Sequence, residues 1–159
     1  MAELEVVGVV ARALSEEQRQ RLGDQAEALA KGPGVAVVDI PAREHQVRLK
    51  ERTGNRVLDI CIGEAEAAAI AFGLQGDAMP RPMTHDFIGS VLGALDDVSV
   101  LRVVITKREN ETFYAELELR HRKRVVGVDC RPSDGIAVAV RLDVPIIAAD
   151  DLEPVFAAA

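Results

Sequence analysis

Aromatic residues are scarce in this chain of 159 residues, which has four Phe, one Tyr and no Trp. Proteins that bind single-stranded nucleic acid usually stack the bases on several aromatic rings, so this composition argues against a stacking platform. Basic residues are also fewer than acidic ones: the chain has 19 Lys and Arg and 26 Asp and Glu, which gives a net charge of −7. The overall field therefore repels phosphate, and any binding of nucleic acid needs a local basic patch.

Cysteines and long apolar runs are few as well. Cys61 and Cys130 have no CxxC or Cys/His spacing, which argues against a zinc motif or a disulfide framework and predicts reduced thiols. The N-terminus MAELEVVGVV has no basic segment before an apolar core, and no later stretch reaches about 18 uncharged apolar residues. We therefore expect a cytoplasmic protein with no membrane partner.

The remaining composition, 48% apolar and 28% charged, is that of an ordinary globular domain. Alternating and β-branched segments predict strands over residues 4–10, 35–40, 46–52, 57–62, 98–106, 113–120, 124–130 and 144–148. Amphipathic or Ala-rich segments predict helices over about 16–31, 64–74, 84–95 and 133–142. This irregular order predicts an α+β fold, with one mixed, largely antiparallel sheet packed with three or four helices. We expect one domain over residues 1–152 and a frayed tail over 153–159.

Two short segments share the same chemistry: Arg81-Pro82-Met83-Thr84-His85-Asp86 and Arg131-Pro132-Ser133-Asp134. Each places Arg-Pro before a hydroxyl residue that can cap a helix and an Asp that the helix dipole favours. Helix initiation explains these features, but it explains neither the Arg in each copy nor His85. The repeated chemistry predicts that the two helix starts meet in space.

Such a meeting point has two interpretations. In the first, Arg81, Arg131, Thr84 and Ser133 bind phosphate at the helix N-termini. Asp86, Asp134 and Asp129 are then candidate ligands of a divalent cation, and the candidate catalytic residues are His85, Asp86 and Asp134, with His85 activating water. In the second, Arg81 and Arg131 pair with Asp134 and Asp86 and join the two helix starts structurally, with His85 as a hydrogen-bonding residue.

The segment Arg120-His121-Arg122-Lys123-Arg124 connects two predicted strands and is the basic cluster that can oppose the net charge. Arg120, Arg122, Lys123 and Arg124 are therefore the candidate nucleic-acid patch. The alternative is a solvated turn without a ligand. A small mixed sheet also leaves an edge or apolar face exposed, so we expect a homo-oligomer, with a dimer as the first expectation.

Four segments together resemble the bifunctional nuclease domain family. They are Ile62-Gly63-Glu64-Ala65-Glu66-Ala67, Arg81-Pro82-Met83-Thr84-His85-Asp86, Thr112-Phe113-Tyr114-Ala115 and Asp129-Cys130-Arg131-Pro132-Ser133-Asp134-Gly135-Ile136-Ala137. The resemblance covers about residues 46–152. It implies that family's α+β fold and activity on RNA and DNA, with Mg²⁺ or Mn²⁺ as the cofactor. Residues 13–45 form a longer link after the first strand than the family usually has, and we expect this insertion to cover or reshape a groove.

The sequence therefore leaves two hypotheses. One is a metal-assisted nuclease that hydrolyses phosphodiester bonds of RNA or DNA. The alternative is a non-catalytic oligomeric module that binds or regulates through a protein or a small anion. The low aromatic content and the acidic field favour the module, whereas the resemblance favours the nuclease.

Overall fold

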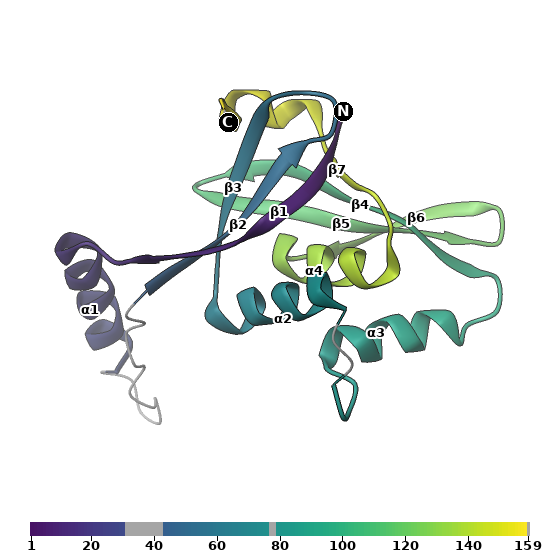
Figure 1. The fold of residues 1–159 in the computed structure, drawn as a ribbon, viewed down its shortest axis with the longest axis horizontal. Coiled ribbons are helices and arrows are strands. Elements are labelled where there is room, and N and C mark those ends of the chain that lie inside the picture. The colour runs from purple at the N-terminus through teal and green to yellow at the C-terminus, as the bar shows by residue number, and fades with distance from the viewer. Residues whose placement is uncertain (31–42, 77–78, 159) are drawn as a thin grey trace.

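The computed structural model describes residues 1–30, 43–76 and 79–158, and a single sheet of eight strands forms its framework (Figure 1). The strands are β1 (Ala2–Ala13), β2 (Arg43–Glu51), β3 (Arg56–Ile62), β4 (Val98–Glu109), β5 (Thr112–His121), β6 (Arg124–Cys130), β7 (Ile146–Ala148) and β8 (Ala157–Ala158). Their order across the sheet is β6-β5-β4-β7-β1-β2-β3-β8. Among the described strand pairs, β4 with β7 is parallel and the others are antiparallel. The predicted α+β fold is confirmed.

The helices are α1 (Glu16–Ala30), α2 (Glu64–Gln75), α3 (Thr84–Gly93) and α4 (Pro132–Leu142), followed by a short 3-10 helix, η1 (Asp150–Val155). Figure 1 shows α2, α3 and α4 on one face of the sheet, where α4 contacts both of the others. Helix α1 stands apart, at the far end of β1 and β2 (Figure 1). In the described ranges, none of the helices has the length and apolarity that a membrane crossing requires.

The core lies between the sheet and α2 and α4. Alternation places Val47 and Leu49 of β2 opposite Ile60 and Leu58 of β3, and all four side chains are buried. Helix α4 is buried over most of its length, including Ile136, Ala137, Val138 and Ala139. Each fully buried large apolar side chain contributes about 1.5–3 kcal/mol. The position of the α4 N-terminus is therefore fixed by packing along the whole helix.

Gly135 permits the close approach of α4 to the sheet. A Cβ atom at this position would lie 2.9 Å from Cγ1 of Val103 in β4 and 3.2 Å from Sγ of Cys130 in β6. Glycine weakens a helix by roughly 1 kcal/mol relative to Ala. Here it allows the first turn of α4 to rest directly on β4.

The C-terminal segment differs from expectation. Residues 153–158 do not form a frayed tail, because β8 pairs with β3 and Arg56 donates hydrogen bonds to both Glu153 and Glu51. The ion pairs and the short strand hold the chain end against the β2–β3 hairpin. The strand predicted over residues 35–40 lies outside the described residues.

Candidate functional site

The two helix starts meet, as their repeated chemistry predicts. His85, in the first turn of α3, places Nε2 3.2 Å from Oδ1 of Asp134 in the first turn of α4. The two residues are 49 positions apart in the sequence, and the packing of α3 against α4 brings them together. His85 is buried, with a side-chain exposure of 11%, while that of Asp134 is 30%.

The helix caps differ from those predicted. The N-cap residues are Met83 and Arg131, and Thr84 and Ser133 lie inside the first turns of α3 and α4 without making a side-chain cap bond. Pro132 explains the earlier start of α4, because a proline at the first helical position already has a helical φ and has no N–H to satisfy. The predicted capping roles of Thr84 and Ser133 are therefore wrong.

The Asp86 carboxylate accepts hydrogen bonds from two partners. Its Oδ2 accepts a hydrogen bond of 2.8 Å from the backbone N–H of Met83, and its Oδ1 accepts one from Nε of Arg141, in the last turn of α4. The backbone N–H and the guanidinium hold the pKa of Asp86 below its ordinary value. The side chain of Arg141 is only 10% exposed. The sequence around Asp86 does not predict Arg141 as its partner, because this contact depends on where the end of α4 lies relative to α3.

Asp134 is also paired. Nε and an amino group of Arg131 donate to its two oxygens at 2.7 and 3.1 Å. Partial burial opposes ionisation, but the hydrogen bonds from Arg131 and His85 prevail and hold the pKa of Asp134 below its ordinary value. Arg131 makes a further ion pair of 2.8 Å with Glu66 of α2. Sequence reasoning assigned Glu66 no part in this site, since a carboxylate in a first helical turn is expected on dipole grounds alone.

These contacts decide how well the site fits a divalent cation. Magnesium requires several oxygen ligands in near-octahedral geometry. Asp86 and Asp134 already accept hydrogen bonds from arginines, and alternation along β6 places Asp129 on the opposite face of the sheet from Cys130 and α4. Within the described ranges, no three His, Cys, Asp or Glu side chains are arranged to hold a metal. The residues as placed do not fit a metal centre. The two helix starts are joined by His85 with Asp134 and by Asp86 with Arg141, and not by the predicted pairing of Arg81 and Arg131 with the aspartates of the opposite start.

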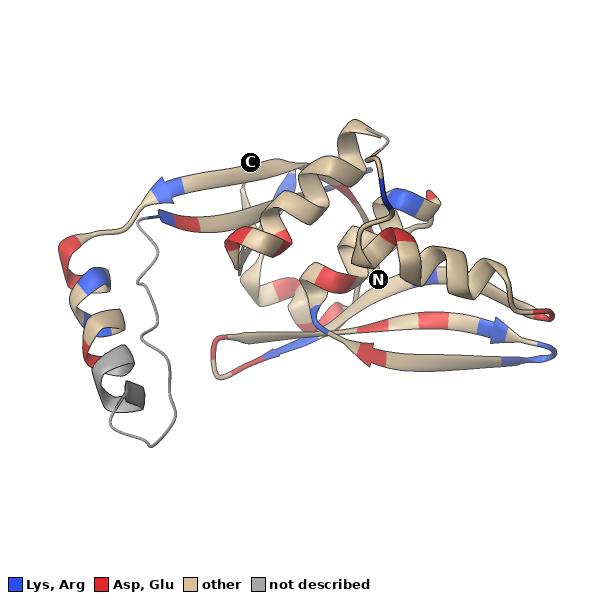
Figure 2. Ribbon diagram, turned by 90° about the horizontal axis from the view of Figure 1, so that it is seen from below, with Lys and Arg blue, Asp and Glu red and all other residues tan. Residues whose placement is uncertain are grey.

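The other candidate cations lie apart from this cluster. Arg81 is exposed before α3, and no hydrogen bond or ion pair links it to another described residue. Arg120, Arg122, Lys123 and Arg124 are exposed at the turn between β5 and β6, at the far tip of this hairpin in Figure 2. At about 3.3 Å per residue, β6 separates this turn from Arg131 by roughly 20 Å. The structure therefore does not unite the basic turn with the helix starts.

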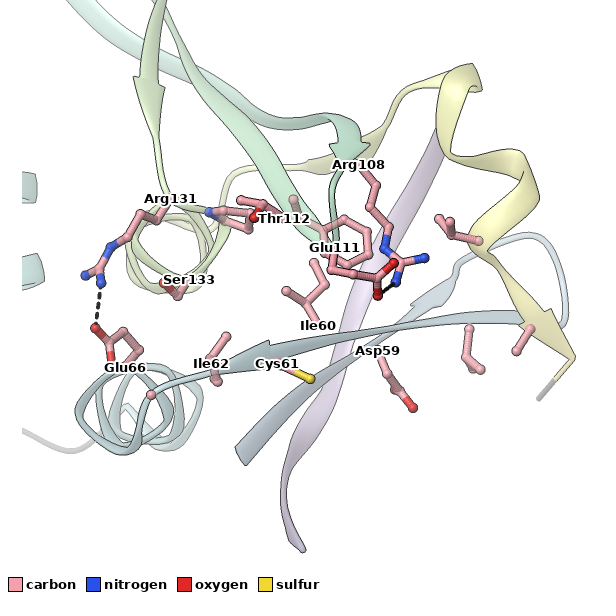
Figure 3. Close-up of a pocket in the computed structure, with 16 residues that line it drawn as sticks. Asp59, Ile60, Cys61, Ile62, Glu66, Arg108, Glu111, Thr112, Arg131 and Ser133 are labelled. Atoms are coloured by element: carbon pink, nitrogen blue, oxygen red, sulfur yellow. Dashed lines mark hydrogen bonds and ion pairs between the residues drawn. The ribbon is translucent and has the colours of Figure 1, made fainter. Parts of the chain in front are cut away.

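A groove of 660 Å³ lies directly beside Arg131 (Figure 3). It is bounded by β3, the start of α2, the β4–β5 turn, the start of α4 and the C-terminal segment. Figure 3 shows Arg131 and Arg108 on opposite sides of the apolar residues Ile60 and Ile62. Ser133 of α4 also lines the groove. It is thus a concave surface with an apolar floor, a cation at each side and a helix N-terminus in its wall.

The insertion after the first strand forms a second hollow. This hollow of 380 Å³ lies between α1, β2 and the start of α2, and includes Arg21, Arg43 and His45 in its lining. Ile62 and Gly63 line both this hollow and the larger groove. Helix α1 thus adds a wall next to the β3–α2 junction.

Comparison with known proteins identifies the family. The family model described as "Bifunctional nuclease domain" matches residues 47–154. This chain belongs to the bifunctional nuclease domain family. The match begins in β2 and ends in η1, so the bifunctional nuclease domain includes both helix starts and the groove residues up to Pro154, while β1 and α1 precede it.

Two relatives show how this bifunctional nuclease domain compares with other proteins. An uncharacterized protein of Mycobacterium tuberculosis strain H37Rv is 43% identical over 109 residues, or 69% of this chain and 64% of the relative. The protein named Bifunctional nuclease 1 of Oryza sativa subsp. japonica is 25% identical over 132 residues, or 80% of this chain and 40% of the relative. The matches thus span less than two thirds of these relatives' own length.

Proposed function

We propose that this domain hydrolyses phosphodiester bonds of RNA or DNA and binds the phosphates in the groove beside Arg131. Membership of the family supports this function, as does the similarity to a rice protein named as a bifunctional nuclease. The observation that carries the proposal is the position of Arg131, whose side chain is 65% exposed at the N-terminus of α4 in the groove wall. An exposed arginine can make a bidentate contact with phosphate, and the positive end of a helix dipole favours an anion.

Phosphate binding at Arg131 requires an exchange of partners. Glu66 and Asp134 already accept hydrogen bonds or ion pairs from this guanidinium. A bound phosphate must displace one or both carboxylates, so Arg131 binds it more weakly than a free arginine would. This competition predicts weak binding that is sensitive to salt, in keeping with the net charge of −7.

The same exchange of partners frees a carboxylate, Asp134, that can accept a proton during hydrolysis. When phosphate takes the place of Asp134 on Arg131, the Asp134 carboxylate is released next to the bound phosphate with His85 still hydrogen-bonded behind it. The released Asp134 carboxylate can then accept a proton from the attacking water as the new P–O bond forms, and this proton passes to the leaving oxygen as the old P–O bond breaks. Asp86 remains bound to Arg141 and anchors α3.

The test is a cleavage and binding assay on single-stranded RNA and DNA, with magnesium, manganese or EDTA. At equal folded fraction, Arg131→Ala should weaken binding, and Asp134→Asn should bind but lose cleavage. Glu66→Gln is the matched control, because removing this competing charge should strengthen phosphate binding several-fold while leaving Arg131 in place. Equal cleavage by the parent and all three variants would exclude this groove as the active site, and the EDTA arm determines whether a metal is needed.

The basic turn between β5 and β6 is a second proposed contact with nucleic acid. Each phosphate neutralised on a single strand contributes a log–log salt slope of about −0.7. Replacing Arg120 and Arg122 by Ala should therefore reduce the slope and the affinity without changing sequence preference, because phosphate contacts do not read bases. An unchanged slope would place binding elsewhere.

A non-catalytic module that binds a protein or a small anion is the second candidate. The pairing of Asp86 and Asp134 with arginines and the burial of His85 favour it. This candidate predicts that the parent chain binds an anion such as inorganic phosphate at Arg131 but cleaves neither RNA nor DNA under any metal condition.

A further inference from the structure

The side of the groove that faces Arg131 carries a second arginine. Arg108, near the end of β4, lines the groove with a side chain that is 34% exposed. Its guanidinium carbon lies 5.5 Å from the centre of the Phe113 ring, and a guanidinium N–H donates a hydrogen bond to Glu111 in the β4–β5 turn. The ring and the carboxylate thus hold this cation at the rim of the groove.

A phosphate can replace Glu111 on Arg108 at little cost. The Glu111 side chain is 86% exposed, and ion pairs with so exposed a partner contribute little to stability. A phosphate offers the guanidinium two oxygens for a bidentate contact, as a carboxylate does. The relation of Arg108 to Glu111 therefore repeats that of Arg131 to Glu66 on the opposite side of the groove.

Ser133 adds a hydroxyl without a partner to the Arg131 side of the groove. The residue is only 6% exposed in the first turn of α4, and it lines the groove on the same side as Arg131 (Figure 3). Its hydroxyl makes no hydrogen bond with another described residue. Because no side-chain oxygen of the described residues is enclosed without a partner, this hydroxyl opens on the groove. It can therefore donate a hydrogen bond to a phosphate oxygen that Arg131 holds.

The register of the sheet places the two arginines two strands apart. Arg108 is paired with Phe113 of β5, and Ala115 of the same strand is paired with Cys130, the residue before Arg131. At about 4.8 Å between neighbouring strands, the Cα atoms of the two arginines are roughly 10 Å apart. The floor between them is apolar and includes Ile60 and Ile62 (Figure 3). Two phosphates of one strand can thus lie at the cations while the sugar or base between them contacts this floor.

We propose that the groove binds two phosphates of one nucleic-acid strand, the scissile phosphate at Arg131 and Ser133 and a neighbouring phosphate at Arg108. This inference rests on the proposed function and adds a substrate class, namely strands with at least two phosphates rather than a lone phosphodiester. The groove of 660 Å³ lies within the range of about 300–1,000 Å³ that is typical of small-ligand sites. It therefore holds a short single-stranded segment and is too small for a duplex.

The test compares two probes by calorimetric titration in EDTA: the thymidine dinucleotide TpT, with one phosphate, and the trinucleotide TpTpT, with two. Chromatography verifies that the probes stay intact. The parent should bind TpTpT about tenfold more tightly than TpT. Arg108→Ala should remove this preference and leave the affinity for TpT unchanged, whereas Ser133→Ala should weaken both probes equally. Glu111→Gln should strengthen TpTpT alone; Gln is chosen over Gly because Glu111 has a left-handed φ of 65°, and Gly would also relax the turn.

Lys107→Ala is the matched control. Lys107 is also a cation near an aromatic ring, 4.7 Å from the centre of Tyr114, but alternation along β5 places Tyr114 on the opposite face from Phe113. This variant should keep the preference for TpTpT, and thermal denaturation verifies that each variant is folded. Equal affinity of the parent for both probes, or a preference that survives Arg108→Ala, would overturn this inference alone. Binding that Arg131→Ala does not weaken, or no binding of either probe, would overturn the proposed function and this inference with it.

Discussion

The two Arg-Pro helix starts have nearly the same sequence but different partners. At the second start, Arg131 binds Asp134 of its own helix and Glu66 of α2. At the first, Arg81 contacts none of the described polar groups within bonding distance, and Asp86 is bound instead by Arg141 from the far end of α4. The repeated proline and aspartate encode helix initiation, whereas the partner of each charge is set by the packing of α2, α3 and α4.

The two helix starts also differ in role, because one makes a structural contact and the other presents an arginine to a ligand. The Asp86–Arg141 pair joins α3 to α4 with one partner almost fully buried, so it is a structural contact. Arg131 lies in the groove wall with most of its side chain exposed, so it is available to a ligand. We therefore expect substitutions at the first start to act on folding and those at the second start to act on binding.

The largest effect on stability is expected from Asp86→Ala. This change removes the acceptor for the N–H of Met83 and leaves Arg141, only 10% exposed, without its carboxylate. The expected loss is about 2 kcal/mol in the free energy of unfolding, measured by urea denaturation. The double variant with Arg141→Met should be more stable than Asp86→Ala alone, because the unpaired buried charge is gone. Strictly additive losses would show that the two residues do not interact.

The second prediction concerns acid. In the folded state the pKa values of Asp86 and Asp134 lie below the ordinary 3.8. Their ionised forms therefore stabilise the fold above this pH, and the stabilisation is lost as pH falls through the lower folded-state values. The difference in unfolding free energy between the parent and Asp86→Asn/Asp134→Asn should stay constant from neutral pH to about 5 and shrink below 3.8. A difference that keeps its size at pH 3 would contradict the ionic origin of these contacts.

Arg131→Ala should cost less stability than Asp86→Ala. Its ion pairs are largely solvated, and exposed pairs of this kind contribute about 0–1 kcal/mol. The same denaturation series measures this loss. A loss of unfolding free energy larger than that of Asp86→Ala would contradict the assignment of the first helix start to structure and of the second to binding.

The smallest effect is expected from Arg81→Ala. An exposed side chain that forms no ion pair with another described residue contributes within about 0.5 kcal/mol. Unfolding should therefore be unchanged, and so should phosphate binding at the groove. Loss of binding in this variant would show that Arg81 reaches a ligand despite its separation from Arg131.

Much of the architecture could be predicted from the sequence, because alternation and β-branched residues identify strands regardless of their order in the sheet. Strand β6 begins and ends at the predicted residues. The shared chemistry of the two helix starts also predicted that they meet. The partners Arg141 and Glu66 could not be predicted, because they belong to helices whose ends meet the site only after packing. The position of β8 was missed for the same reason, since a two-residue strand leaves no pattern in the sequence.

Strand β7 has only three residues, yet it lies between β4 and β1 and joins the two halves of the sheet. Its neighbours on one side are residues 2–4, so the first and nearly the last parts of the described chain must come together before the sheet is continuous. Contacts this distant in sequence form late and slow folding, because the intervening chain must first be ordered. On the ribosome, β1–β3 and β4–β6 can form as separate hairpin sheets, but they can unite only after Ile146–Ala148 have been synthesised.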